Sequence, residues 1–541
     1  MAMAYLVEID AYVPAAWITG ADGVGLLADP GTALATEPRV ETLRFSSGLG
    51  FMSRPDDRPP NAYYEPRVSV PFNFERLIFT DGTSAGAADT GYGEIELVNP
   101  DGELDFLAEC GLDGRQVRLL HGDEAGPLAD FELVFVGTVT QPEFSWRRVV
   151  LPVRDRAEEL RKAIQQNVYA GSNQGPAGVE GTADDLKDKG KPLTFGRCRN
   201  VPATCVNGST LVFQIHDGPV AAIPAVYDRG LAMAATTDYP TVAALTAAAF
   251  AAGQYATCLA MGLFRLWSRP DGAVTADVDG DATGGVLAGS VAAVIRRIAL
   301  TRAGLAEADM DRAAFEALEA ANPALVGYFQ DGGSKAEIND VFDALCASIG
   351  AWWCFDRLGR LTVGRLEAPA GEPLATLTPV ELLDSGDGLE ILPAHDLADG
   401  TPVYRVSLDY QRNWSRQDDN DLAGGVADER RAWLAEDLRT VAATDASIRA
   451  VHLLAPELTV ETLLDDAEAA RAEADRLLAL HGAARLRLVL PVKCEYARGL
   501  DLGNVIAVRI ARFGLSGGRL FVVIGMTEEY ETGRVTLEVV G

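Results

Sequence analysis

The stretch that most constrains the fold lies near the C-terminus, where apolar and polar residues alternate. From Leu486 to Tyr496 every second residue is apolar or aromatic, and charged residues take most of the positions between. Successive strand residues point to opposite faces of a sheet, so this pattern predicts a strand with one buried and one solvated face. Before it, Thr459–Leu480 carries apolar residues at the spacing of a half-buried helix. A helix that leads into a sheet is therefore expected here.

Three further strands are expected after this one. They span Asn504–Ile510, Arg519–Met526 and Arg534–Val540, and glycine-containing segments at 514–518 and 531–533 separate them as turns. Neighbouring strands joined by short turns form a β-meander. The sequence therefore predicts a C-terminal meander that follows a helix.

Residues 1 to about 165 are predicted to be mostly β. Six segments have the composition of strands: Tyr5–Ile9, Arg67–Phe79, Gly93–Val98, Gln116–Leu120, Phe131–Val139 and Arg148–Val153. Turn-forming residues follow the third segment and predict a hairpin over Gly93–Gly102. A short helix is expected at Arg156–Gln165, and an exposed loop at Phe51–Pro60. A small barrel or sandwich with one long loop fits this pattern.

The middle of the chain changes character twice. Residues 166–190 are rich in Gly, Asn, Asp and Lys and are expected to form a linker, followed by short strands and one Ala-rich helix, Thr241–Ala252. Helical periodicity then predicts three helices: Val291–Arg302, Met310–Ala321 and Lys335–Ile349. The third begins with a capping box at Ser334–Glu337, and a hairpin is expected after it at Ala351–Leu366.

A chain of 541 residues is too long for one hydrophobic core. The expected fold class is α+β, a β-rich multidomain chain with two tube-like β-barrel domains, an intervening β insertion and a small helical segment. The expected domains are an N-terminal barrel-like domain (1–165), a β-rich insertion (166–290), a helical and hairpin domain (291–400), and a C-terminal barrel-like domain (401–541) that contains the helix at 459–480.

The charge of the chain excludes several classes of partner. Asp and Glu number 78 against 47 Lys and Arg, a net charge of −31. This charge argues against binding nucleic acid by phosphate neutralisation and against docking on an anionic membrane. No apolar run approaches the length of a membrane span, and Met1–Ile9 lacks the features of a secretion signal. Seven cysteines, an odd number, do not indicate a disulfide framework, so synthesis in a reducing cytoplasm is expected.

Candidate metal ligands are scattered. The five histidines, His121, His216, His395, His452 and His481, lie far apart in the sequence and predict neither a metal site nor a catalytic triad. The spacings of Cys198 with Cys205 and of Cys346 with Cys354 are wider than zinc sites use, and buried free thiols are expected.

Other motifs also fail to indicate chemistry. The segment Asp277–Asp281 resembles the start of a calcium loop, but its glycine comes too early and Ala288 stands where a bidentate Glu is needed. A turn is the better interpretation. No dinucleotide, P-loop, hydrolase or zinc-protease motif occurs. We therefore expect no catalytic, cofactor-binding or metal-binding residues, no cofactor, and a protein that is not an enzyme.

Several stretches resemble baseplate hub or tail-tip hub proteins of tailed bacteriophages, in particular those with long non-contractile tails. The stretches are Gly93–Asp105, Phe135–Val139, Lys191–Gly196, Asn200–Val201, Gln214–Gly218, Asp311–Phe315, Trp353–Arg360, Tyr410–Trp414, Ala472–Arg476, Leu500–Gly503, Arg512–Gly514 and Gly533–Leu537. Together they are distributed over most of the chain, although each one is short.

This resemblance implies a structural virion protein at the tail tip or baseplate, made in the cytoplasm of the bacterial host. It implies a homotrimer whose paired barrel domains match sixfold tail rings. The implied partners are the distal tail ring, the tape measure and tip or fibre proteins. Such a hub closes the tail channel and opens for DNA ejection, with genomic DNA passing through without specific binding. A net charge of −31 suits such a conduit, although it equally suits solubility.

Two alternatives remain open at this stage. One is a tail-associated cell-wall hydrolase, which would need a cleft with convergent carboxylates or a Cys–His pair. The other is a carbohydrate- or receptor-binding module that uses Trp352, Trp353 and Trp414 as stacking platforms. Since Trp352 and Trp353 are adjacent on an expected strand, only one of them can face solvent.

Overall fold

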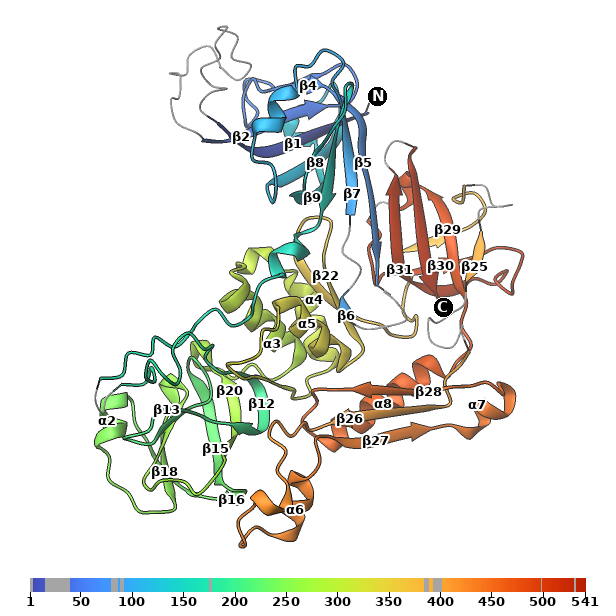
Figure 1. Cartoon of the computed structure of the whole chain (residues 1–541). Coiled ribbons are helices and arrows are strands. Elements are labelled where there is room, and N and C mark those ends of the chain that lie inside the picture. Colours follow the sequence, from blue (N-terminus) through green and yellow to red (C-terminus); the bar gives the residue numbers. More distant parts are fainter. Residues whose placement is uncertain are drawn as a thin grey trace.

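The computed structural model describes residues 3–14, 39–78, 86–87, 92–174, 178–383, 389–392, 401–497, 499–529 and 532–541. Within these residues the chain is rich in strands, which form several sheets around a small helical unit (Figure 1). The expected α+β, β-rich multidomain class is confirmed. His395 lies outside the described residues.

Among the described residues, the largest sheet contains sixteen strands from both ends of the chain, in the order β25-β29-β32-β31-β5-β7-β11-β9-β8-β1-β2-β4-β3 with β10, β24 and β30 beside this path. Its N-terminal strands are β1 (Met3–Val13), β2 (Arg39–Ser46), β3 (Phe51–Met52), β4 (Tyr63–Pro66), β5 (Val68–Leu77), β7 (Tyr92–Val98), β8 (Gln116–Asp123), β9 (Glu132–Val139), β10 (Glu143–Phe144) and β11 (Arg148–Arg154). Its C-terminal strands are β24 (Ala375–Leu377), β25 (Glu390–Leu392), β29 (Arg487–Lys493), β30 (Val505–Val508), β31 (Arg519–Glu529) and β32 (Arg534–Val540).

Strand β5 joins the two groups of strands. It pairs with β7 over residues 68–75 on one edge and with β31 over residues 73–77 on the other, where Leu77 lies opposite Gly525. Asn73, where the two ladders overlap, lies opposite Glu94 on one edge and Glu529 on the other. A Cβ atom on Gly93 of β7 would lie 1.7 Å from the Asn73 carbonyl oxygen, so the close approach of β7 to β5 requires glycine here. A hydrogen-bonded ladder therefore connects the N-terminal and C-terminal strands.

The two groups of strands have separate hydrophobic cores. The N-terminal core draws on β1, β2, β5, β7, β8, β9 and β11, and the C-terminal core on β29 to β32 together with Leu377 of β24. The sequence predicts two tube-like barrels. Over the described residues the strands instead share one sheet, and its pairing path is open, ending at β3 and β25.

The insertion contains two five-stranded sheets and a short helix, α2 (Val242–Ala247). The first sheet, in the order β16-β15-β20-β12-β21, consists of β12 (Leu193–Pro202), β15 (Val220–Asp228), β16 (Leu231–Ala232), β20 (Val274–Asp281) and β21 (Gly327–Gln330). The second, in the order β13-β14-β19-β18-β17, consists of β13 (Thr204–Asn207), β14 (Val212–Gln214), β17 (Ala234–Asp238), β18 (Gln254–Cys258) and β19 (Leu263–Leu266).

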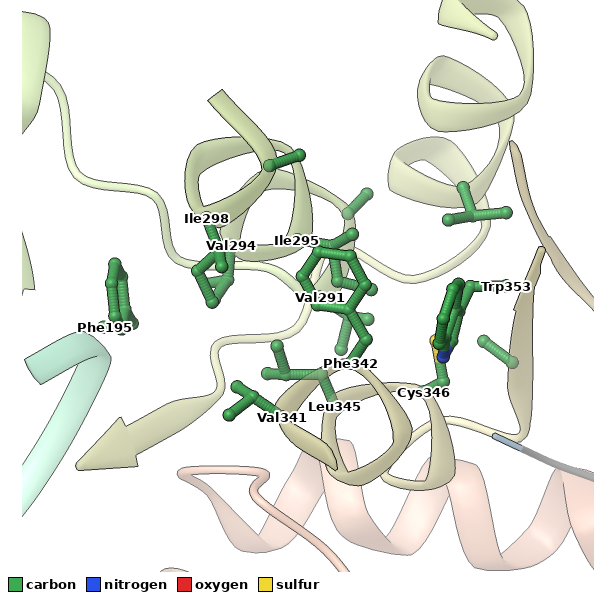
Figure 2. Packing of buried hydrophobic residues seen from close by; sticks show 14 of the residues in the cluster. Phe195, Val291, Val294, Ile295, Ile298, Val341, Phe342, Leu345, Cys346 and Trp353 are labelled. Carbon is green, nitrogen blue, oxygen red and sulfur yellow. The ribbon is translucent and has the colours of Figure 1, made fainter. Parts of the chain in front are cut away.

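The helical unit contains α3 (Val291–Ile298), α4 (Arg312–Ala321) and α5 (Ile338–Ala347), followed by the expected hairpin of β22 (Ala351–Phe355) and β23 (Leu361–Arg365). A short strand, β6 (Gly86–Ala87), pairs with β22. Figure 2 shows side chains of α3 and α5 packed face to face, with Phe342 close to Trp353. Their rings lie 5.5 Å apart, edge to face. The apolar stripes read from the sequence therefore form the core of this unit.

The remaining unit is a three-stranded sheet of β26 (Arg405–Tyr410), β27 (Arg439–Thr444) and β28 (Glu457–Glu461) with helix α8 (Ala467–His481). Three short helices, α6 (Asp428–Leu434), α7 (Ala446–Val451) and α9 (Cys494–Ala497), lie in the same part of the chain. The prediction of one helix over 459–480 is wrong at its start. Residues 457–461 pair in parallel with β26, and the helix begins only where Asp466 accepts a hydrogen bond from the Ala469 N–H.

Four other local predictions are also wrong. No hairpin closes over Gly93–Gly102, because β5 and β11 already occupy both edges of β7, and Asn99 instead receives the Leu104 N–H at the start of a 3-10 turn. The helix expected at Arg156–Gln165 is a 3-10 turn, Arg156–Leu160. The helix expected at Thr241–Ala252 ends at Ala247, the last residue of α2. Helix α5 begins after Glu337, because the Ser334 hydroxyl bonds to Asp331 instead of capping the helix.

The domain limits expected from the sequence stay a prediction. Strands β24 and β25, which precede residue 400, pair with the C-terminal strands β30 and β29. Strand β21, which follows residue 290, completes a sheet of the insertion by pairing with β12.

Candidate functional site: a charged seam between the ends of the chain

A buried ion network, which we call the seam, lies where β5 meets the C-terminal strands. It consists of Arg76, Arg357, Asp501 and Glu528. The Arg76 side chain is 2% exposed, and its Nη2 lies 2.8 Å from Asp501 Oδ1 and 3.9 Å from Glu528 Oε1. Arg357, in the turn between β22 and β23, approaches the same carboxylates at 3.7 Å and 3.5 Å. Two arginines and two carboxylates from three parts of the chain therefore neutralise one another.

The charges of the network stabilise one another. Burial by itself lowers the pKa of Arg76, but Asp501 and Glu528 outweigh it and raise the pKa of Arg76 above its usual value. Removing one partner from a buried ion pair costs about 3–5 kcal/mol, because the remaining charge stays buried without compensation. The network therefore fixes the turn at Arg357 against the shared sheet.

A small cavity lies beside the network. It is lined from the N-terminal strands by Tyr5, His121 and Glu132, and from the C-terminal part by Met526 and Glu528 among others. Its volume is about 60 Å³, whereas ligand pockets usually measure about 300–1,000 Å³. This space suits a few water molecules and not a substrate.

A second buried joint connects the hairpin to α8. The Glu473 side chain is 1% exposed and forms ion pairs with Arg365 of β23 and with Arg476, whose Nη2 lies 2.6 Å away. Arg476 also donates to the Leu366 carbonyl at 2.8 Å. Burial lowers the pKa of Arg365, and Glu473 opposes that shift. The hairpin is therefore fastened on two sides, to the seam and to α8.

A third joint connects the insertion to the unit containing β26. Arg199 donates two hydrogen bonds of 2.9 Å to the Asp465 carboxylate, and the Asn200 amide donates to Asn413 Oδ1 at 2.8 Å. Asn200 lies in a bulge of β12 with a φ of 55°, a left-handed conformation that asparagine tolerates. Asn200 and Asn413 both belong to stretches that carry the family resemblance, and the structure brings them together.

The histidines lie in different surroundings. His216 and His481 are buried, and the His121 ring packs against Tyr5 with 4.6 Å between centroids and a tilt of 32° between the ring planes. His452 lies partly exposed after α7. Within the described part of the chain, no group of three or more His, Cys, Asp or Glu side chains could hold a metal ion.

The cysteines follow the sequence prediction with one exception. Cys198, Cys346 and Cys354 are buried free thiols, whereas Cys205 is exposed on β13, contrary to expectation. Burial raises the pKa of all three buried thiols, so the thiolate that binds metals is disfavoured at these positions.

The aspartates of the calcium-like segment have other partners. Asp277 accepts from the Asn200 N–H and the Tyr227 hydroxyl at 2.9 Å each. Asp279 pairs with Arg197 at 2.8 Å, and Asp281 pairs with His216 and Arg297. These carboxylates therefore hold protein side chains together in a strand, in place of the expected turn.

The tryptophans proposed as stacking platforms are mostly covered. Trp352 and Trp353 are both buried, because β22 lies between two cores: Trp353 packs in the helical core and Trp352 in the C-terminal core. Trp352 and Trp353 do point to opposite faces of β22, as expected for a strand, but neither face is exposed to solvent. Trp414 is partly buried and packs edge to face on Phe329.

Large apolar side chains are exposed elsewhere. Trp146 is 92% exposed in the turn between β10 and β11, and Leu454 is 86% exposed after α7. The Trp146 turn is well fixed, since the backbone N–H and the hydroxyl of Ser145 both donate to the Arg148 carbonyl. A groove of about 720 Å³ lies between α3 and α4, with Ala292, Met310 and Phe315 in its lining. Exposed apolar side chains such as Trp146 and Leu454 are typical of protein contacts.

No motif marks the seam in the sequence, but a usable signal exists. Phe72, Phe74 and Arg76 share one face of β5, and both phenylalanines are buried. A charged residue on a buried face needs a partner. The alternation thus predicts a buried ion pair at Arg76, although not the identity of the partner.

Comparison with known proteins gives distant structural similarity. No protein-family model and no curated protein sequence match the chain. The fold is similar to a tail protein from Neisseria meningitidis, with 12% identity over 88% of this chain and 95% of that chain and a TM-score of 0.36. It is also similar to a chain of the gene transfer agent virion (16% identity, 65% and 84% covered, TM-score 0.41) and to prophage tail protein gp18 from Listeria monocytogenes (7%, 89% and 92%, 0.37).

These solved structures are all components of tails or of virions. Because every TM-score lies below 0.5, we base the functional proposal on this chain's own residues. Among the described residues, no helix is long and apolar enough to cross a membrane.

Proposed function

We propose that the chain is a structural, non-catalytic virion protein that forms the trimeric hub of a phage tail tip or baseplate. In this role it closes the tail channel, anchors fibre or tip proteins, and opens for DNA ejection. Its partners would be the distal tail ring, the tape measure and tip proteins. The observation that carries the proposal is the pairing of β5 with β31, because it places two groups of strands, each with its own core, side by side in one sheet.

Two features support a structural role in a tail assembly. Three copies of a chain with two such groups of strands would present six groups around an axis, which suits a sixfold ring of tail proteins. The C-terminal group is tied to the β22–β23 hairpin through Arg357, and the hairpin is tied in turn to α8 through Glu473. Rigid attachment is what a tail component needs in order to transmit force.

Among the exposed side chains, we propose one as a contact between the copies of the trimer. Trp and Arg are enriched at the energetic centres of interfaces, and Trp146 lies exposed beside Arg147. We expect Trp146→Ala to weaken assembly of the trimer and to leave the fold intact. Mass photometry and electron-microscopy class averages measure this directly. The matched control is Trp267→Ala, which removes a partly exposed indole from the insertion.

Several outcomes would count against the hub. A wild-type chain that remains a monomer and has no affinity for tail proteins would overturn the proposal. If Trp146→Ala assembles as well as wild type, Trp146 does not form the trimer contact, and the trimer would have to form through other surfaces. A basic inner wall in the assembled particle would contradict passage of DNA along an acidic channel. Clearing of cell-wall substrate in zymograms would favour the hydrolase alternative.

A further inference from the structure

A turn with an exposed indole lies at the start of β11. In this turn, residues 143–148, the Trp146 side chain is 92% exposed and Phe144 is 44% exposed, and the neighbouring Arg147 is also exposed. The shape of the turn is fixed, because the N–H and the hydroxyl of Ser145 both donate to the Arg148 carbonyl. A large ring on a rigid turn loses little conformational freedom when it becomes buried. The Trp146 turn is therefore built to fill a pocket on another molecule.

The groove between α3 and α4 has a floor of buried apolar groups. Ala292, Met310 and Phe315 line it, and each is at most 5% exposed. The volume of the groove, about 720 Å³, lies within the range of about 300–1,000 Å³ found for pockets that hold drug-sized molecules. An indole is smaller than such a molecule, so the groove has room for a tryptophan side chain.

The lining of the groove carries an excess of negative charge. Two of its carboxylates are balanced by ion pairs with arginines of the same lining, Glu307 with Arg296 and Glu316 with Arg312. Glu319 adds a third carboxylate, which accepts a hydrogen bond from the uncharged Ser290 hydroxyl. The groove thus has one negative charge in excess beside its apolar floor. The Trp146 turn matches it with an indole beside the cation Arg147.

The Trp146 turn cannot enter the groove of its own chain. Beyond the other end of β11, Arg156 pairs at 2.9 Å with Asp309, which precedes the lining residue Met310. All seven residues of β11 pair with β7, so the strand is held straight and spans about 23 Å. The turn and the groove therefore lie near opposite ends of one fixed strand, and they can meet only between two copies of the chain.

We propose that Trp146 of one copy binds in the groove between α3 and α4 of the next copy, with Arg147 facing Glu319. This inference rests on the trimer proposed above and names the contact that builds it. Because the turn and the groove are different surfaces, the contact is heterologous. Contacts of this kind form a ring when the rotation from copy to copy closes.

Filling the groove tests one half of the contact. Ala320 is an exposed residue of α4 in the lining, and Ala320→Phe places a ring in the space that the indole needs. We expect the dissociation constant of the trimer, measured by mass photometry, to rise about thirtyfold or more, as for Trp146→Ala. The matched control is Ala317→Phe, at an exposed position of the same helix outside the lining, which is expected to assemble like wild type.

A mixture of two variants identifies the two halves of the contact. Trp146→Ala keeps the groove and Ala320→Phe keeps the turn, so each alone is expected to remain a monomer at a concentration at which wild type is trimeric. Mixed in equal amounts, they can form one contact of the proposed kind, and we expect a heterodimer that cannot close into a ring. A mixture that stays monomeric, or a variant that dimerises alone, would overturn the proposal.

Exchange of charge tests the position of Arg147. Arg147→Glu places a carboxylate against Glu319, and we expect it to weaken assembly about tenfold, as does Glu319→Arg. The variant with both substitutions regains the attraction with reversed signs and should assemble within about threefold of wild type. Both residues are exposed, so circular dichroism should show the fold of wild type. A double variant that assembles no better than the single ones would contradict this pairing.

The outcomes separate this contact from the proposed tail role. If wild type is a trimer and Ala320→Phe assembles equally well, the contact is refuted and the tail role stands. If Ala320→Phe remains a trimer but loses affinity for other tail proteins, the groove holds a tail protein and not a second copy, which also refutes the contact. A wild type that is monomeric and binds no tail protein would overturn both proposals.

Discussion

The seam at Arg76 and a joint at His216, which connects the insertion to α3, are both buried charge clusters, but they differ in the groups that they contain. The seam consists of arginines and carboxylates that pair with one another. The joint pairs Asp217 with Arg302 and Asp281 with Arg297, and its His216 ring accepts a hydrogen bond from the Thr194 N–H of β12 and faces Asp281 of β20 at 3.2 Å. The comparison teaches that buried arginine–carboxylate pairs connect distant parts of the chain in both places, and that the joint adds a ring whose hydrogen bonds tie two strands together.

The largest expected effect comes from breaking the seam. Arg76→Ala leaves Asp501 and Glu528 with Arg357 alone, and we expect the free energy of unfolding to fall by about 3–5 kcal/mol. Chemical denaturation followed by circular dichroism measures the loss. The control is Arg312→Ala, since Arg312 forms an exposed ion pair with Glu316 on α4 and its removal should change nothing measurable. A loss no greater than that of the control would show that the network is not energetically coupled.

A smaller effect is expected at the joint. Arg302→Ala removes the guanidinium from Asp217 but leaves the Asn167 amide, so we expect a loss of about 2–3 kcal/mol. The insertion should also become more accessible to protease near residues 166–190. The exposed pair Arg471–Asp475 on α8 gives a matched control in Arg471→Ala. Undiminished stability together with unchanged proteolysis would contradict a role for Arg302 in the joint.

The smallest expected effect is a change in acid sensitivity. Burial raises the pKa of Asp281, but hydrogen bonds from His216 and Arg297 outweigh it and lower the pKa to about 2. A lowered pKa stabilises the folded state above the ordinary carboxyl pKa, and this stability is lost as the pH falls toward 2. The contribution is about 2 kcal/mol. Asp281→Asn should therefore flatten the dependence of unfolding free energy on pH between about 4 and 2.

Denaturation at a series of pH values provides that test. The reference is Asp475→Asn, because Asp475 is an exposed carboxylate on α8. If the Asp281 variant shows the same slope as wild type, the low pKa of Asp281 does not contribute to stability.

Sequence periodicity predicted the structure well where burial of one face of an element is enough to determine its secondary structure. The stripe of α5 is confirmed, because a single face of this helix is buried. The strand predicted over Leu486–Tyr496 is confirmed only in part: β29 covers Arg487–Lys493, whereas Cys494–Ala497 form the short helix α9. Predictions were wrong where packing or pairing with a part of the chain distant in sequence determines the local structure. Residues 459–461 belong to the helix predicted over Thr459–Leu480, yet they lie in β28, which pairs with an edge of β26. Trp352 and Trp353 alternate correctly, but a second core covers the face that was expected to be wet.

The candidate site was the least predictable part of the molecule. Arg76 and Asp501 are separated by most of the chain, and nothing local indicates that they meet. The sequence predicts no site at His216, whereas in the structure its neighbour Asp217 and the aspartates at 277–281 form ion pairs and hydrogen bonds with distant residues. Pairing between distant charges depends on topology, which a single sequence specifies only through its folded core.

The pairing of β5 with β31 also has a consequence for synthesis of the protein. About 440 residues separate Leu77 from Arg519, so β5 emerges from the ribosome long before its partner exists. At about 5–20 residues per second the delay is roughly 20–90 seconds. During that time the strand has an open edge, which is a site for unwanted pairing with other nascent chains. Pro71, the exposed Glu75 and Arg76 lie on this strand and are residues of the kind that discourage such pairing, so the arginine that later closes the seam also protects the unfinished chain.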